Sequence, residues 1–142
     1  MRRSLGTVDL VPVIATRLTA QIGAARTIYQ YDVPSGDLPD RYIVVRASTG
    51  ESTSDNASGK VDMRTPVIYC TSVARAATEQ QAAHEAAWGS LKTVDALIDW
   101  RPTVGQASWL IDHFSSLPPT PDNSLPGPVS YAVDEFIPRY QP

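Results

Sequence analysis

Residues 78–98 carry the pattern that most restricts what this chain can fold into. Thr78 and Gln81 form a capping box, in which each side chain satisfies a backbone N–H at the start of a helix. Apolar residues then recur at steps of three and four, as on one face of a helix: Ala83, Ala87, Leu91, Val94 and Ile98. Because Pro102 disfavours a helical conformation at Arg101, the helix should end there. We expect this helix to pack closely on a sheet through its stripe.

A second helix is predicted from about Asp9 to Ala25. Its apolar stripe has the same spacing: Val11, Ile14, Leu18, Ile22 and Ala25. Asp9 is the expected N-cap, and Pro12 is tolerated in the first turn because its missing N–H would have no helical partner there.

Five further segments are rich in strand-forming residues or alternate between two faces. They are residues 27–31, 41–48, 61–74, 107–117 and 129–140. Segment 41–48 is apolar on both faces, which predicts a central strand, whereas Pro66 indicates an edge, bulge or break and Pro138 an edge. The proline-containing residues 118–124 are predicted as a stiff loop. Consecutive hairpins favour an α+β fold with a mostly antiparallel sheet and the two main helices packed on one face.

Residues 49–60 are almost entirely polar and separate two predicted strands. We expect them to form the tip of a long projecting β-hairpin, since connections of about 12 residues are unusual in compact domains and are often functional. Charged residues on its arms and tip are the candidates for contact with a neighbouring subunit: Arg46, Glu51, Asp55, Lys60 and Arg64. The alternative is a surface hairpin with solvated charges.

Length and charge predict one soluble domain that spans residues 1–142. The formal net charge of −3 excludes a basic surface for duplex DNA. Cys70 is the only cysteine, so no intrachain disulfide can form, which fits a reducing compartment. Apolar runs are shorter than the ~20 residues of a membrane helix, and Asp9, Pro12 and Arg17 interrupt the run that a signal peptide would need. We expect a protein of the cytoplasm with no membrane partner.

Residues that could carry chemistry are few and scattered. Neither His84 nor His113 has a second ligand at the spacing of a metal site. Cys70 lies in an apolar strand, where cysteine usually behaves as a small core residue. Asp134 and Glu135 should point to opposite faces of a strand, which favours solvated or interfacial charges over a pair of cooperating carboxylates.

The sequence therefore predicts no catalytic residue, no metal site and no cofactor. An enzyme would need a non-local site, for example around Asp112 and His113, which the strand pattern places on opposite faces. The tryptophans could form a stacking platform for single-stranded nucleic acid, but the acidic charge balance favours a packing role: Trp88, Trp100 and Trp109.

The order of these elements and three short stretches together suggest a family. The stretches are residues 67–71 (Val-Ile-Tyr-Cys-Thr), residues 78–83 at the helix start (Thr-Glu-Gln-Gln-Ala-Ala) and residues 127–134 (Gly-Pro-Val-Ser-Tyr-Ala-Val-Asp). The chain resembles, over most of its length, the tail terminators and related head-to-tail connector proteins of long-tailed, siphovirus-type bacteriophages, particularly those of actinobacterial hosts.

The resemblance implies a structural virion protein that forms a homohexameric ring. Such a ring caps the head-proximal end of the tail tube and joins it to the neck. The implied partners are copies of the same chain, the tail tube protein and neck proteins, while DNA passes through the channel without specific binding. The implied location is the tail–neck junction of the virion, after synthesis in the host cytoplasm. Alternatives are a head-completion or stopper protein, or a monomeric binding module that does not self-associate.

Overall fold

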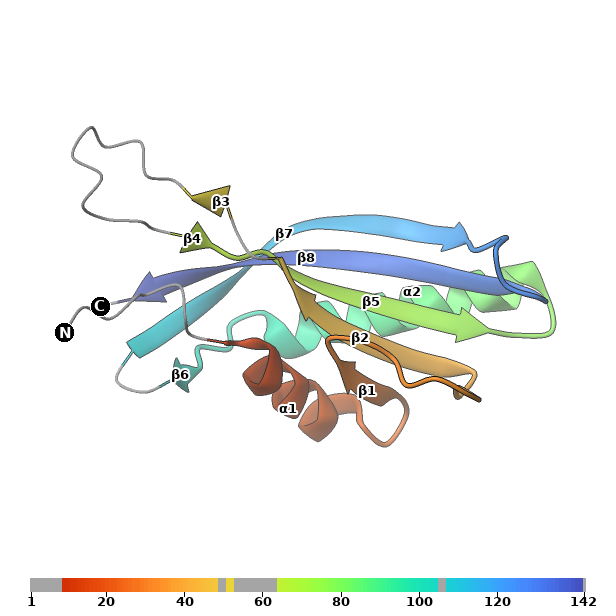
Figure 1. Cartoon of the computed structure of the whole chain (residues 1–142), viewed down its shortest axis with the longest axis horizontal. Helices are drawn as coiled ribbons and strands as arrows, with labels where there is room; N and C mark the ends of the chain where they lie inside the picture. The colour runs from red at the N-terminus through yellow and green to blue at the C-terminus, as the bar shows by residue number, and fades with distance from the viewer. Residues whose placement is uncertain (1–8, 49–50, 53–63, 105–106, 142) are drawn as a thin grey trace.

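The structure is a computed structural model that describes residues 9–48, 51–52, 64–104 and 107–141. Its two helices and its strands make an α+β fold, as expected (Figure 1). In chain order the elements are α1 (Val11–Ile22), β1 (Thr27–Gln30), β2 (Arg41–Ala47), β3 (Glu51–Ser52), β4 (Arg64–Thr65), β5 (Ile68–Arg75), α2 (Glu79–Leu97), β6 (Thr103–Val104), β7 (Ala107–Pro121) and β8 (Val129–Gln141).

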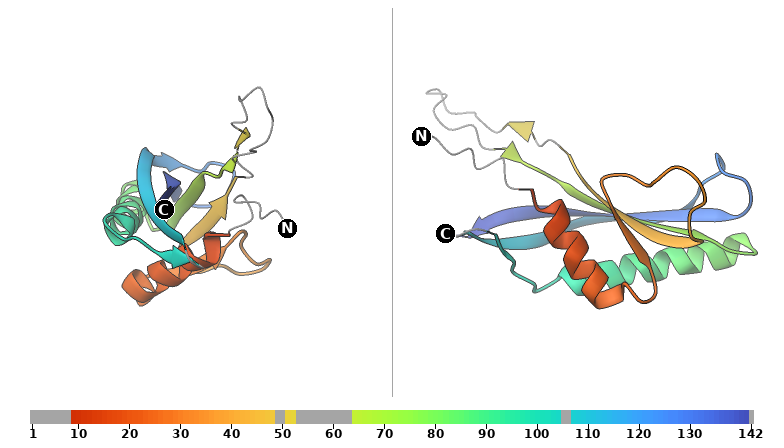
Figure 2. Two further views of the ribbon diagram at one scale, coloured as in Figure 1. Left: turned by 90° about the vertical axis from the view of Figure 1, so that its left-hand side faces the viewer. Right: turned by 60° about the horizontal axis from the view of Figure 1, so that its bottom comes forward.

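Six of the strands form one sheet in the order β1-β2-β5-β8-β7-β6. The expectation of a mostly antiparallel sheet is corrected to a mixed sheet, because β1 runs parallel to β2, with Thr27 opposite Tyr42. Residues 31–40 return the chain to the end of the sheet from which β1 started, and only a connection of that kind can join parallel neighbours. The sheet also curls, as the end-on view in Figure 2 shows.

The predicted long hairpin is not tested by the structure. Glu51–Ser52 pairs antiparallel with Arg64–Thr65 in a separate two-stranded sheet. Residues 53–63, which would make up most of the hairpin, lie outside the described residues.

Helix α1 confirms most of its predicted stripe, since Val11, Ile14, Leu18 and Ile22 are all buried. The helix is shorter than predicted and ends at Ile22, so Ala25 lies outside it. Leu10 occupies the N-cap position, and Asp9 instead accepts a hydrogen bond from the backbone N–H of Val11 (3.0 Å) through Oδ1.

Helix α2 begins as predicted, with the hydroxyl oxygen of Thr78 accepting a hydrogen bond from the backbone N–H of Gln81 (3.1 Å). Its predicted buried face is wrong. Leu91 and Ile98 are 58% and 54% exposed, whereas the buried residues are mostly small: Ala82, Ala86, Gly89, Thr93, Ala96 and Leu97.

Close approach to the sheet explains this rotation of α2. A Cβ placed on Gly89 would lie 2.9 Å from the Cβ of Ser72 on β5, which is closer than real side-chain contacts. Only the smallest residues therefore fit between α2 and β5, and the larger apolar residues are turned outward.

The prolines in and next to the strands test the strand predictions. The strand predicted over 61–74 breaks at Pro66, between β4 and β5. Strand β7 continues to Pro121 instead of ending at residue 117, with register shifts between His113 and Ser115 and between Leu117 and Thr120. The loop prediction for its prolines was therefore wrong.

Strand β8 is interior rather than an edge, because it lies between β5 and β7. Pro138 is tolerated there since pairing with β5 ends at Phe136, which leaves β8 with β7 alone as its ladder partner at that point.

One apolar core joins both helices to the sheet. Its members come from α1, β2, β5, the end of α2, β7 and β8, and include Ile14, Ile43, Ile68, Leu97 and Phe136. Cys70 is a buried member of this core, as predicted. Within the described part of the chain, neither helix is long and apolar enough to cross a membrane.

Candidate functional site

The described residues include only three of those predicted to contact a neighbouring subunit, and two of them, Glu51 and Arg64, lie on the paired short strands β3 and β4. Arg46, near the end of β2, donates from Nε to the backbone oxygen of Tyr31 (3.0 Å) and lies 3.7 Å from Oδ1 of Asp32. It is therefore engaged within its own chain. Glu51 and Arg64 belong to β3 and β4, and Asp55 and Lys60 lie outside the described residues.

Large apolar side chains on the surface are a more prominent feature, and sequence analysis missed them. Among the described residues, those that are exposed are Tyr31, Leu91, Ile98, Phe114, Leu117, Leu125 and Tyr140. Two groups lie on well-defined elements. Leu91 in α2 and Ile98, directly after that helix, form the α2 patch, while Phe114 and Leu117 of β7, which are 64% and 44% exposed, form the β7 patch.

Leu117 of the β7 patch lies on a different side of the sheet from the α2 patch. Leu117 is paired with Val133 of β8, whose neighbours Ala132 and Asp134 are buried beneath α2. Because successive side chains of a strand point to opposite faces, Leu117 lies on the face away from α2. The α2 patch lies on the outer side of the helix, opposite its buried row of small residues.

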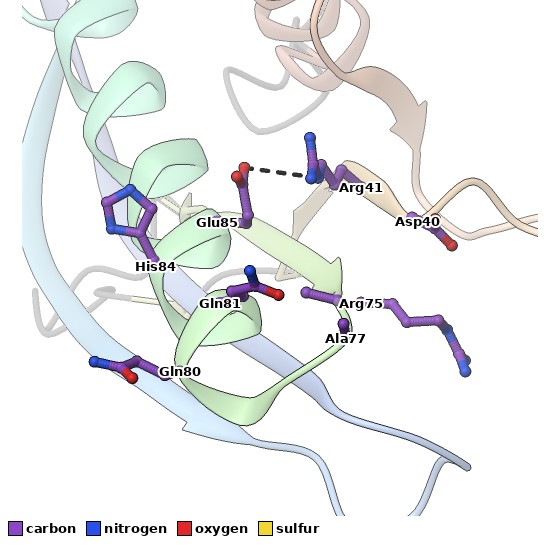
Figure 3. A pocket seen from close by; sticks show the side chains of 9 residues that line it. Asp40, Arg41, Arg75, Ala77, Gln80, Gln81, His84 and Glu85 are labelled. Carbon is purple, nitrogen blue, oxygen red and sulfur yellow. Dashed lines mark ion pairs between the residues drawn. The ribbon is translucent and has the colours of Figure 1, made fainter.

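A polar cleft of about 610 Å³ lies where α2 begins, beside residues 40–41 and 75–77 (Figure 3). On its inner side Glu85 pairs with Arg26 (2.8 Å) and with Arg41 (3.6 Å). Arg75 extends away from this pair in Figure 3 and donates to the backbone oxygen of Pro126 (2.6 Å). Glu85 and Arg41 are therefore paired with each other, while Arg75 is directed away from them (Figure 3).

Arg26 is a buried cation that joins the end of α1 to α2. Its side chain is only 5% exposed, and its guanidinium lies 4.3 Å from the ring centre of Trp88 in addition to its ion pair with Glu85. Burial lowers the pKa of Arg26, while the hydrogen bond and charge of Glu85 oppose that shift. The tryptophan therefore has a packing role here.

The other two tryptophans also pack within the chain. Arg17 lies 5.4 Å from the ring of Trp100. Trp109 meets Tyr140 edge-on, with ring centres 5.6 Å apart. Each tryptophan thus has its own partner, which does not support a shared stacking platform.

A buried polar cluster lies between α2, β7 and β8. Asp134 is fully buried, and its Oδ1 accepts hydrogen bonds from the hydroxyls of Ser90 in α2 (2.9 Å) and Ser116 in β7. His113 Nε2 lies 2.8 Å from Ser116 Oγ and 3.9 Å from Asp134 Oδ1. Burial raises the pKa of Asp134, against the lowering effects of Ser116, Ser90 and His113.

Sequence reasoning placed Asp134 among solvated or interfacial charges, and that prediction is wrong. Its opposite orientation to Glu135 was correct, since Asp134 is buried and Glu135 is half-buried. The partners Ser90 and Ser116 are 44 and 18 residues away in sequence, so no local sequence pattern indicates that they bond to Asp134.

The orientation of these hydrogen bonds is the reverse of that in a serine nucleophile site. Ser116 gives its single hydroxyl proton to Asp134, so His113 Nε2 must act as the donor toward Ser116. A nucleophilic serine would instead donate to the histidine. Asp112, the residue proposed with His113 for an enzyme site, is bonded to Arg139 (2.9 Å) rather than to the histidine.

Within the described residues, no three histidine, cysteine, aspartate or glutamate side chains gather as metal ligands. Cys70 is fully buried, and burial raises the pKa of its thiol, with the charge of Asp134 adding to the shift. The thiol is therefore neutral and inaccessible in the folded chain. Comparison with protein-family models and with curated protein sequences finds no match.

Proposed function

We propose that this chain is a structural virion protein that assembles into a hexameric ring, caps the head-proximal end of a phage tail tube and joins the tube to the neck. The proposal takes its biological setting from the resemblance in the sequence. A head-completion or stopper protein of the same neck is the nearest alternative, and a monomeric binding module is the more distant one.

The observation that carries the proposal is that exposed apolar residues lie on two sides of the subunit, with Leu91 and Ile98 on the outer side of α2 and Leu117 on the opposite face of the sheet. A ring of identical subunits needs a heterologous interface, in which one face of a subunit meets a different face of the next. The α2 patch (Leu91, Ile98) and the β7 patch (Phe114, Leu117) supply two such faces. Contiguous exposed apolar surface marks association sites, and we propose that these residues contribute to such surfaces.

The acidic balance of the chain also supports this role. With a net charge of −3, the subunits would repel DNA phosphates rather than bind them. DNA can then pass through a channel without being held by its walls.

The mass of the protein in solution tests the proposal. Light scattering after size exclusion, with and without tail-tube protein, should show a species of about six chain masses under at least one of these conditions. A strict monomer under both conditions would contradict the ring and favour a monomeric binding module.

Variants within the patches locate the interface. Leu91→Asp and Phe114→Asp should each reduce the fraction of assembled protein, because either would bury an unpaired carboxylate between subunits. Gln80→Asp adds the same charge to an exposed position of α2 outside the patch and serves as the control. Normal assembly of both patch variants would exclude these surfaces.

A further inference from the structure

Asp134 is a buried carboxylate whose two oxygens have unequal surroundings. Both of its hydroxyl donors, Ser90 and Ser116, converge on Oδ1. Oδ2 is buried and has no hydrogen-bond partner among the described residues. An ionised carboxylate with an unpartnered buried oxygen is costly, whereas a carboxylic acid can keep both hydroxyl bonds at Oδ1 and carry its proton on Oδ2.

No permanent cation among the described residues faces this carboxylate. On β7, His113 lies 3.9 Å from Oδ1, and its side chain is 33% exposed. On β5, the residue opposite is Cys70, whose thiol is neutral. From α2, the hydroxyl of Ser90 contacts the carboxylate. The charged residue Glu85 of the same helix is paired with Arg26 and Arg41 instead. The charge on Asp134 therefore depends on proton exchange with solvent rather than on a fixed ion pair.

A second unpartnered oxygen lies on the same sheet face. Ser72 Oγ on β5 is buried without a hydrogen-bond partner among the described residues. In the β5–β8 register, Ser72 lies opposite Ala132, two residues from Asp134, so the two side chains share the surface beneath α2. Among the described residues neither oxygen is hydrogen-bonded to the other, so this face supplies no hydrogen bond that would stabilise a negative charge on Oδ2.

We propose that Asp134 is a proton switch that sets how firmly β7 is closed against α2 and β8. In the closed form the carboxyl holds a proton on Oδ2 and accepts hydrogen bonds from Ser90 and Ser116 on Oδ1. Loss of that proton to solvent leaves a buried anion, and opening of the segment around Ser116 lets water reach it.

Strand β7 is the element that opens, because it is the least constrained of the three. Strand β8 is paired on both sides by β5 and β7 along most of its length. The register of β7 is interrupted on both sides of Ser116, between His113 and Ser115 and between Leu117 and Thr120. Strand β6 pairs only with the first two residues of β7, so among the described residues nothing pairs with its outer edge near Ser116.

The direction of the pH effect follows from proton binding. Burial raises the pKa of Asp134, so the closed form binds the proton more tightly than the open form. The closed form is then favoured at low pH and is weakened as the pH rises from the value of an exposed carboxyl through the raised pKa. Once Asp134 is ionised in the open form and still protonated in the closed form, opening should increase about tenfold per pH unit.

Amide hydrogen exchange across a pH series tests the switch, with protection factors corrected for intrinsic exchange. In the natural chain, protection of the amides of residues 113–117 should fall with rising pH more steeply than that of β2. In Asp134→Asn, which has the same shape and no charge, that excess pH dependence should vanish. Asp112→Asn, which removes an exposed carboxyl from β7 itself, should retain it.

Two results would overturn the proposal. One is the same pH dependence in Asp134→Asn as in the natural chain. The other, which holds even if that variant fails to fold, is a carbon-detected titration of the Asp134 carboxyl in the natural chain that shows the pKa of an exposed aspartate.

Discussion

The small gap between α2 and β5 makes Gly89→Ala an informative substitution. Two effects oppose each other. In a free helix, alanine is favoured over glycine by about 0.8–1.0 kcal/mol. Here the new methyl would lie 2.9 Å from both Cβ and Oγ of Ser72. The Oγ can rotate away, but Cβ is fixed to the backbone of β5, so the helix or the strand must shift.

Overpacking of this kind costs about 1–3 kcal/mol. After the gain in helix propensity is subtracted, Gly89→Ala should lower the free energy of unfolding by roughly 1 kcal/mol, within a range of about 0–2 kcal/mol. Gly89→Leu adds more volume to the same gap and should cost more. Urea unfolding followed by circular dichroism, with an unchanged slope, measures both values.

A matched experiment separates crowding from propensity. Ser72→Gly removes both crowding atoms, so Gly89→Ala should be less harmful, or stabilising, in that background than in the natural chain. If Gly89→Ala alone stabilised the protein by the full propensity gain, α2 would not lie as close to β5 as the structure places it, and the explanation for its rotated face would be wrong.

Two further outcomes follow from burial. In urea unfolding, Phe136→Ala should lower the free energy of unfolding by about 3–5 kcal/mol, because Phe136 is the largest fully buried side chain among the described residues. Leu91→Asp, at an exposed site, should change it by only about 0.5 kcal/mol. Similar losses for the two variants would contradict this assignment of the core. The Cys70 thiol should react with a maleimide only after unfolding, because it is buried and its pKa is raised, and rapid reaction of the native protein would refute its burial.

Much of the secondary structure could be predicted from the sequence because its signals are local. The cap at Thr78 and the apolar spacing of α1 depend only on neighbouring residues, and both appear in the structure. Strand direction has no such signal, which is why the parallel placement of β1 beside β2 was not predicted.

The buried face of α2 shows why periodicity alone was insufficient. Alanines occur in adjacent pairs, at positions 82–83 and 86–87, so two neighbouring rows of small residues fit the same helical spacing. Hydrophobicity predicts that the row with the larger members, Leu91 and Ile98, is the buried one. In the structure the other row is buried, because Ser72 of β5 lies so close to position 89 that glycine is the residue that fits there without a shift of the helix or the strand.

The polar cluster around Asp134 could not be predicted for a different reason. Ionisable residues are seldom fully buried, so a carboxylate in a strand is assigned to the surface by default. Its burial depends on hydroxyls supplied by a helix and by another strand, and their meeting is a property of the whole fold. The apolar patches escaped prediction similarly, since exposure of Leu91 or Phe114 is decided by which neighbours cover it.

The prolines of β7 also restrict how this protein can associate. Past the short strand β6, the outer edge of β7 has no strand beside it among the described residues, and such an edge ordinarily invites another chain to extend the sheet. Pro118, Pro119 and Pro121 have no N–H to offer to an incoming strand, so sheet extension is blocked along that part of the edge. In the ring proposed above, the exposed Phe114 and Leu117 would then make contacts between side chains, while open-ended extension of the sheet from subunit to subunit is disfavoured.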